Sequence, residues 1–70
     1  VMVLVKISIH QSLSEIESLC KVYNGKVLHV SEKAIVGMVA DEPKRVKYFI
    51  EAVKKYRPME IIRSGVVALE

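Results

Sequence analysis

The sequence is poor in residues that carry covalent, redox or metal chemistry. Its 70 residues include one cysteine, two histidines and no tryptophan. A single cysteine, Cys20, excludes an internal disulfide and a four-cysteine metal site. Because disulfides mark oxidising compartments, their exclusion favours the reducing cytoplasm as the location of the protein.

Long hydrophobic runs are also missing. No apolar run approaches the ~20 residues of a transmembrane helix, and the start Val1-Met2-Val3 lacks the pattern of a signal peptide. We therefore expect no membrane association. Since 51% of the residues are apolar, the chain is expected to fold, and its length predicts one domain over residues 1–70. Because it opens on valine, we expect it to be a fragment of a longer protein.

The charge is only mildly basic. Eleven Lys and Arg against eight Asp and Glu give a net charge of +3, which is less than a nucleic-acid binder usually carries. Many of the cations nevertheless fall in one short span, with Glu51 as its single acid: Lys44, Arg45, Lys47, Lys54, Lys55 and Arg57. On a helix such a cluster is most often a solvated face, and the alternative is a docking surface for an acidic partner.

The first half of the chain has the pattern of a strand, a helix and a strand. Met2 to Ile9 alternates apolar residues with a period of two, which predicts a strand. Ser12 stands three residues before Glu15, the capping-box spacing, and predicts a helix start. Asn24-Gly25 predicts its left-handed end. The expected buried stripe of this helix consists of Leu13, Ile16, Leu19, Cys20 and Tyr23.

The second half has the pattern of a hairpin, a helix and a strand. Residues 26–30 and 34–40 are β-type runs on either side of Ser31-Glu32-Lys33. Asp41 is expected to cap the next helix, with Pro43 in its first turn and Arg57-Pro58 at its end. Its predicted buried stripe is Val46, Phe49, Ile50 and Val53, and on its opposite side Glu51 is expected to pair with Lys47 and Lys55. The final strand is expected over residues 61–69.

This element order predicts an α+β, ferredoxin-like (ACT-like) βαββαβ sandwich. The expected antiparallel sheet has four strands in the order 4-1-3-2 and two helices on one face. The two terminal strands are expected to be neighbours in the middle of the sheet. RNA-recognition modules share the topology but stack bases on aromatics of the two central strands. Here all four aromatic residues fall in helical segments, so no nucleic-acid partner is expected: Tyr23, Tyr48, Phe49 and Tyr56.

The strands contain more apolar residues than two helices can cover. Met2 and Leu4 in the first strand, and apolar residues of both parities from 35 to 39, cannot all face the helices. We hypothesise that the helix-free side of the sheet, or an edge strand, packs against another domain or another copy of the chain. The residues predicted for such an interface are Met2, Leu4, Met38, Arg63 and Val66.

Catalytic, metal-binding and cofactor-binding residues are not predicted anywhere in the chain. His10, Cys20 and His29 are too few and too scattered to make a metal site, and a thiol in an apolar stripe is inert. The acidic residues do not form an acid–base pair. Arg63 is a more interesting residue, because its guanidinium could bind a carboxylate. The alternative is a solvated arginine lying along the sheet edge.

Three segments resemble the C-terminal domain of the acetolactate synthase (acetohydroxyacid synthase) small subunit. They are Met2-Val3-Leu4-Val5-Lys6-Ile7, Tyr23-Asn24-Gly25-Lys26-Val27-Leu28-His29-Val30 and Ile62-Arg63-Ser64-Gly65-Val66-Val67-Ala68-Leu69. The likeness runs nearly end to end, and the last segment is its most specific part. It implies a non-catalytic, regulatory polypeptide of branched-chain amino acid biosynthesis. Such a polypeptide binds and activates a thiamine-diphosphate-dependent catalytic subunit and makes that subunit sensitive to inhibition by valine. It also forms a homo-oligomer.

In the family that this chain resembles, the effector amino acid binds an N-terminal ACT domain, and the present chain would be the second, C-terminal module. ACT domains that bind amino acids usually have a glycine in the turn after the first strand. Here that turn is His10-Gln11-Ser12. The leading hypothesis is therefore a regulatory and interaction module. A stand-alone ACT-type amino acid sensor and a small ferredoxin-like enzyme are the alternatives.

We predict that the 70-residue chain does not bind valine. Isothermal titration calorimetry should give no heat above dilution, because bulky side chains in the turn after the first strand keep backbone amides away from an effector. Micromolar binding would favour the sensor hypothesis instead.

Overall fold

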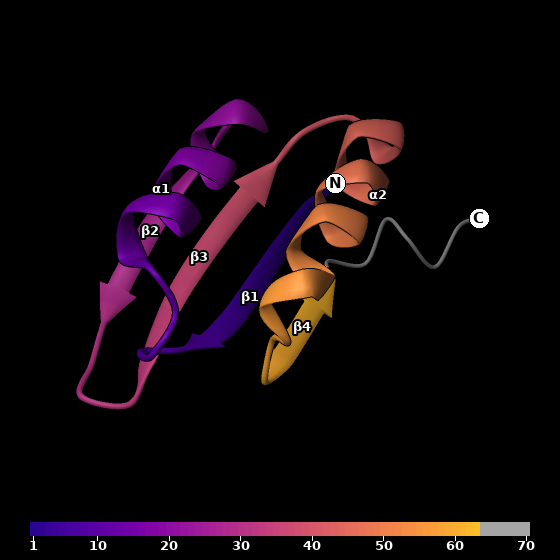
Figure 1. Ribbon diagram of the computed structural model, residues 1–70. Helices are drawn as coiled ribbons and strands as arrows, with labels where there is room; N and C mark the ends of the chain where they lie inside the picture. The colour runs from indigo at the N-terminus through magenta and orange to yellow at the C-terminus, as the bar shows by residue number, and fades with distance from the viewer. Residues whose placement is uncertain (64–70) are drawn as a thin grey trace.

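The computed structural model describes residues 1–63. The order of elements is β1 (Met2–Ser8), α1 (Leu13–Val22), β2 (Gly25–Val30), β3 (Ala34–Ala40), α2 (Pro43–Val53), a 3₁₀ turn (Lys54–Tyr56) and β4 (Glu60–Arg63). The four strands form one antiparallel sheet in the order β2-β3-β1-β4, the predicted order read from the other edge. Both helices lie on the same face of the sheet (Figure 1). The predicted ferredoxin-like fold is therefore confirmed.

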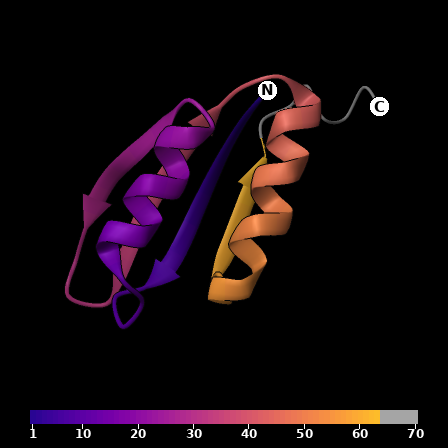
Figure 2. The same ribbon diagram turned by 45° about the horizontal axis from the view of Figure 1, so that its top comes forward.

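The two helices divide the sheet between them. α1 lies over the β2 and β3 half, and α2 lies over the β1 and β4 half (Figure 2). β1 pairs along its whole length with β3, from Met2 opposite Ala40 to Ser8 opposite Ala34. β4 pairs with the other side of β1 only from Val3 to Lys6. The terminal strands are thus neighbours, as predicted, but β4 forms an edge and not the middle, because the hairpin strand β3 occupies the other central position.

The start of α1 follows the sequence signal only in part. Ser12 is the N-cap, and its hydroxyl accepts a hydrogen bond from the Glu15 amide at 3.4 Å. The Glu15 carboxylate does not complete the capping box, since it accepts a hydrogen bond from the Tyr56 hydroxyl at 2.9 Å. After the helix, Asn24 takes the predicted left-handed conformation with φ of 59°. Gly25 is needed for another reason: an added Cβ would lie 2.1 Å from the Met38 carbonyl oxygen.

The ends of α2 differ from the prediction. Glu42 is the N-cap residue and makes no side-chain cap, while Pro43 occupies the first turn as expected. Asp41, predicted as the cap, accepts hydrogen bonds from the Glu42 amide at 2.8 Å and from Arg45 Nε at 2.6 Å. The α-helix ends at Val53, and the 3₁₀ turn continues to Arg57, which has a left-handed φ of 52° before Pro58.

Arg45 joins the two helices. Besides its ion pair with Asp41, it donates a hydrogen bond to the carbonyl oxygen of Val22 at 2.7 Å, where α1 ends. Its guanidinium lies 5.2 Å from the centre of the Tyr23 ring. The hydrogen bond from Arg45 holds the pKa of the Asp41 carboxyl below its ordinary value. Arg45 therefore acts within the fold, whereas the sequence pattern placed it on a cationic outer face.

The core lies between the helices and the sheet. Val3, Val5 and Ile7 of β1 are buried there, and the whole predicted stripe of α2 faces them, with Phe49 completely buried. In α1 the buried residues are Ile16 and Cys20, whereas Leu13 in the first turn is 43% exposed. On the outer side of α2, Glu51 pairs with Lys54 at 3.2 Å rather than with the predicted Lys47 and Lys55.

Gly37 in β3 sets how closely α1 can approach the sheet. An added Cβ there would lie 2.9 Å from Cys20 Sγ. We predict that Gly37→Ala destabilises the domain by about 1–3 kcal/mol through overpacking. Cys20→Ala should relieve the clash, so the double variant should lose about 1 kcal/mol less than the two single variants together. Urea unfolding measures these values. Val53→Ala, which changes a core residue of the other helix, is the matched control. When it is combined with Gly37→Ala, the loss of unfolding free energy should equal the sum of the two single losses.

The Asp41–Arg45 pair predicts a pH dependence of stability. Because the folded-state pKa of Asp41 lies below its ordinary value of 3.8, its contribution is present above that value and is lost as the pH falls through the folded-state pKa. The urea concentration at the unfolding midpoint should therefore decrease as the pH is lowered from about 5 to about 2, and this decrease should be smaller in Asp41→Asn than in the unchanged protein. Glu32→Gln in the β2–β3 turn is the control. An unchanged slope in Asp41→Asn would contradict the role of the pair.

Candidate functional site

The helix-free face of the sheet carries a cluster of apolar side chains. Residues opposite each other on paired strands point to the same side of a sheet. Leu4 lies opposite both Met38 and Ile62, and these residues point away from the face that holds Val3 and Val5. We call the cluster on this side the free-face patch; it consists of Met2, Leu4, Val36, Met38 and Ile62. Met2 is 41% exposed and Ile62 is 50% exposed, while the other three are half-buried.

Charged and polar side chains surround the free-face patch. Lys6 lies opposite Glu60 on β4, and Lys26 of β2 lies opposite Met38. His29 follows a β-bulge in β2 and lies opposite Val36. All four of these polar residues are exposed. An apolar centre with a polar rim is the usual arrangement of a protein–protein interface.

The predicted interface residues do not share one face. Met2, Leu4 and Met38 lie together in the free-face patch. Arg63 lies opposite Val3, so it projects on the helix side of the sheet. Val66 lies outside the described residues. Parity along β4 separates Arg63 from its neighbour Ile62, but only the register between β4 and β1 shows which of the two lies on the same side as Leu4.

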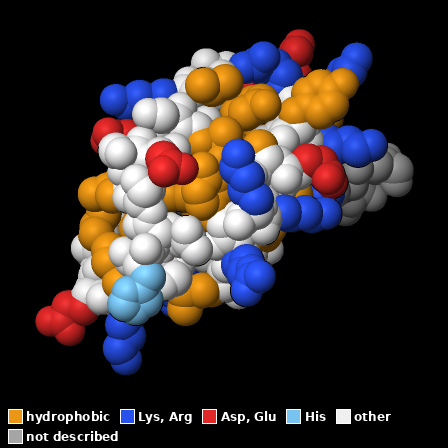
Figure 3. All heavy atoms as spheres, in the orientation of Figure 1, with side chains coloured by type: hydrophobic (Ala, Val, Ile, Leu, Met, Phe, Trp, Pro, Cys, Tyr) orange, Lys and Arg blue, Asp and Glu red, His pale blue; other side chains and the backbone are white. Residues whose placement is uncertain are grey.

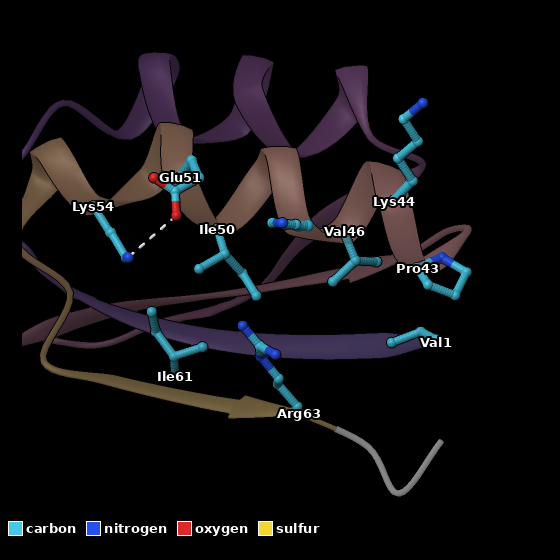
Figure 4. Close-up of a pocket in the computed structure, with 10 residues that line it drawn as sticks. Val1, Pro43, Lys44, Val46, Ile50, Glu51, Lys54, Ile61 and Arg63 are labelled. Carbon is cyan, nitrogen blue, oxygen red and sulfur yellow. Dashed lines mark hydrogen bonds and ion pairs between the residues drawn. The ribbon is translucent and has the colours of Figure 1, made fainter. Parts of the chain in front are cut away.

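Arg63 forms one wall of a groove between α2 and β4. The groove has a volume of about 780 Å³, and lysines of α2 and of the 3₁₀ turn after it form the opposite wall: Lys44, Lys47 and Lys54. Its floor is apolar and consists of Val46, Ile50 and Ile61. In Figure 4 the Arg63 side chain extends from β4 towards α2, across the floor. Seen from the helix side, Lys and Arg side chains gather around α2 (Figure 3).

The residues that could take part in catalysis are separated or engaged elsewhere. Cys20 is completely buried, and burial raises the pKa of its thiol to about 11, which leaves it unreactive. Glu15 accepts a hydrogen bond from Tyr56, and this bond raises the pKa of the Tyr56 hydroxyl. Asp41 and Glu51 are paired with Arg45 and Lys54. Within residues 1–63, no three Cys, His, Asp or Glu side chains converge to hold a metal ion.

Two groups of site residues were missed or read differently at the level of sequence. Ile62 belongs to the free-face patch, and its position opposite Leu4 depends on the register of β4. The groove lysines were interpreted as a solvated helix face. Their spacing of three and seven residues indicates a single stripe, but only the position of β4 turns that stripe into one wall of a groove.

Comparison with protein families decides the identity. The family model described as the small subunit of acetolactate synthase matches residues 1–70, the whole chain. The chain belongs to the acetolactate synthase small subunit family. A small subunit of this synthase has a regulatory role beside a catalytic subunit and is not itself catalytic. The resemblance seen in the sequence is thus confirmed, while no solved structure matches the chain at a significant level. None of the described helices of this small-subunit domain is long and apolar enough to cross a membrane.

Proposed function

We propose that this domain is an assembly module through which the small subunit engages and activates the catalytic subunit of acetolactate synthase. The catalytic partner would be the thiamine-diphosphate-dependent enzyme of branched-chain amino acid biosynthesis. The domain, covering residues 1–70 at the C-terminal end of a longer regulatory polypeptide, would contribute a binding surface and no reacting group. We place the complex in the cytoplasm, where the single thiol of Cys20 stays reduced.

The observation that supports this proposal is the free-face patch. Both helices cover the other side of the sheet, so no described element of this domain packs over Leu4 and Met38. Contiguous apolar surface of this kind typically marks an interaction site. Because the family consists of subunits of an enzyme, a partner protein is the expected occupant.

The composition of the face favours the catalytic subunit over a second copy of this domain. Homodimer interfaces are usually more apolar than interfaces between different proteins. Here charged residues lie directly beside the centre of the free-face patch. Lys26 is opposite Met38, and Lys6 and Glu60 form the next pair on this side of the sheet after Leu4 and Ile62. A partner with its own apolar anchor and complementary charges satisfies such a border better than an identical surface does.

Self-association, which the sequence also predicts, is the second part of the proposal. We infer that a second copy uses the other edge of the sheet, strand β2. There Leu28 is 49% exposed and Val30 is 43% exposed. An edge strand with apolar side chains pairs readily with another chain. This arrangement leaves the free-face patch available to the catalytic subunit.

Met2→Glu tests the assignment of the free-face patch. A carboxylate introduced into an apolar contact must be desolvated without a partner, so binding to the catalytic subunit should weaken about tenfold or more. The measurement is acetolactate formation by the catalytic subunit as the small subunit is titrated in. The variant should require a correspondingly higher concentration to reach half-maximal activation.

Leu13→Glu is the matched control, since Leu13 is 43% exposed against 41% for Met2 but lies in α1 on the other side of the sheet. It should activate normally. Equal losses in both variants, or no loss in Met2→Glu, would contradict the assignment. Sedimentation velocity of each variant alone tests the second copy as occupant: if Met2→Glu dissociates an oligomer, the free-face patch is a self-contact.

A further inference from the structure

The groove between α2 and β4 has a distribution of charge that the free-face patch does not share. Four cationic side chains and one acid line it: Lys44, Lys47, Lys54, Arg63 and Glu51. Glu51 is already paired with Lys54 at 3.2 Å. The remaining cations, Lys44, Lys47 and Arg63, have no acidic counterpart among the described residues that line the groove. This leaves the groove electropositive over an apolar floor.

The cations lie along the groove and do not converge on one point. Lys44 and Lys47 of α2 lie on one stripe with Lys54, the first residue of the 3₁₀ turn that continues the helix, because spacings of three and seven residues bring side chains to the same side of a helix. From Lys44 to Lys54 the helix axis rises about 15 Å at 1.5 Å per residue. Arg63 faces this stripe from β4 (Figure 4). A single carboxylate or phosphate cannot reach all of these charges together.

An extended peptide matches this length and this pattern. About five residues in the extended conformation span 15 Å, at 3.3 Å per residue. Alternate side chains then point to opposite sides, so acidic residues can meet the lysines while apolar residues between them contact Ile50 and Ile61 on the floor. β4 is the last strand of the sheet on this side among residues 1–63, and no further described strand closes the groove.

We propose that the α2–β4 groove binds an extended acidic segment of the catalytic subunit, one in which acidic and apolar residues alternate. This inference rests on the proposed function, because it names a second contact made by the same assembly module. Arg63 is a carboxylate-binding residue on the β4 wall of the groove, and Lys47 is its counterpart in the middle of α2. The free-face patch provides apolar contact area, and the groove adds charge-dependent selection of the partner.

Binding of a model peptide tests the groove directly. The probe is a fluorescein-labelled hexapeptide of alternating glutamate and valine, followed by fluorescence anisotropy with the small subunit. Binding should weaken about tenfold or more in Lys47→Glu/Arg63→Glu, because like charges then face the acidic peptide. It should also weaken as salt is added, since the groove is exposed to solvent. A peptide with glutamine in place of glutamate should bind no better than the double variant binds the acidic probe.

Lys21→Glu/Lys33→Glu is the matched control. It changes the net charge by the same amount, but Lys21 lies on α1 and Lys33 in the β2–β3 turn, outside the residues that line the groove. Its peptide affinity should stay within about twofold of the unchanged protein, as expected for screened surface charges. Equal loss in both double variants would show a general charge effect and overturn the groove. If free glutamate or tripolyphosphate displaces the probe as effectively as unlabelled peptide does, the groove is a small-anion site and the proposal is wrong.

Acetolactate formation separates failure of the groove from failure of the proposed function. We expect Lys47→Glu/Arg63→Glu to raise the small-subunit concentration needed for half-maximal activation, as Met2→Glu does. Normal activation by the groove variant together with impaired activation by Met2→Glu would overturn the groove and leave the assembly module intact. If the unchanged small subunit fails to bind or activate the catalytic subunit, the proposed function itself is wrong. Lys47→Gln/Arg63→Gln, which introduces no new charge, replaces the reversal variant if circular dichroism shows that the latter does not fold.

Discussion

The packing of both helices against a single face of the sheet is the constraint on which the rest of the structure depends. It gives the domain one core, where Val3, Val5 and Ile7 of the central strand β1 meet the buried side of α2. A strand in this position has two faces, and the helices bury only one of them. The other face keeps Leu4 and Met38 at its centre, so the arrangement that stabilises the fold also creates the surface proposed for its partner.

Two local features make this packing possible. Gly37 removes a side chain where α1 crosses β3, and the Cys20 sulfur occupies the space, which explains why the only thiol is buried and inert. Arg45 then links the end of α1 to the start of α2 through Asp41 and the Val22 carbonyl oxygen. Because these groups are committed to the fold, the side chains left for recognition are the exposed lysines of α2, Arg63 and the apolar residues of the free face.

Much of the secondary structure could be predicted because its signals are local. Alternation in residues 2–8, the Ser12 cap and Pro43 in the first turn of α2 each act within a few residues, and all appear where expected. The errors came where another residue competed for the same group: a neighbour four positions along the chain in the case of Asp41, and a residue distant in sequence in the case of Glu15. Asp41 is taken by Arg45 instead of capping α2, and Glu15 is taken by Tyr56 instead of completing the capping box. Leu13 fits the helical stripe by spacing, yet it is 43% exposed in the folded domain.

By itself, the sequence determined the α+β class, the strand order and the excess of apolar strand residues, and its likeness to the small subunit family held over the whole chain. These properties follow from periodicity and residue type, which are readable along the chain. Only the tertiary structure decided that Met2, Leu4 and Met38 lie on one side of the sheet and Arg63 on the other. The reason is physical: the side to which a strand residue points depends on the register between strands far apart in sequence, and a shift of one residue would reverse it.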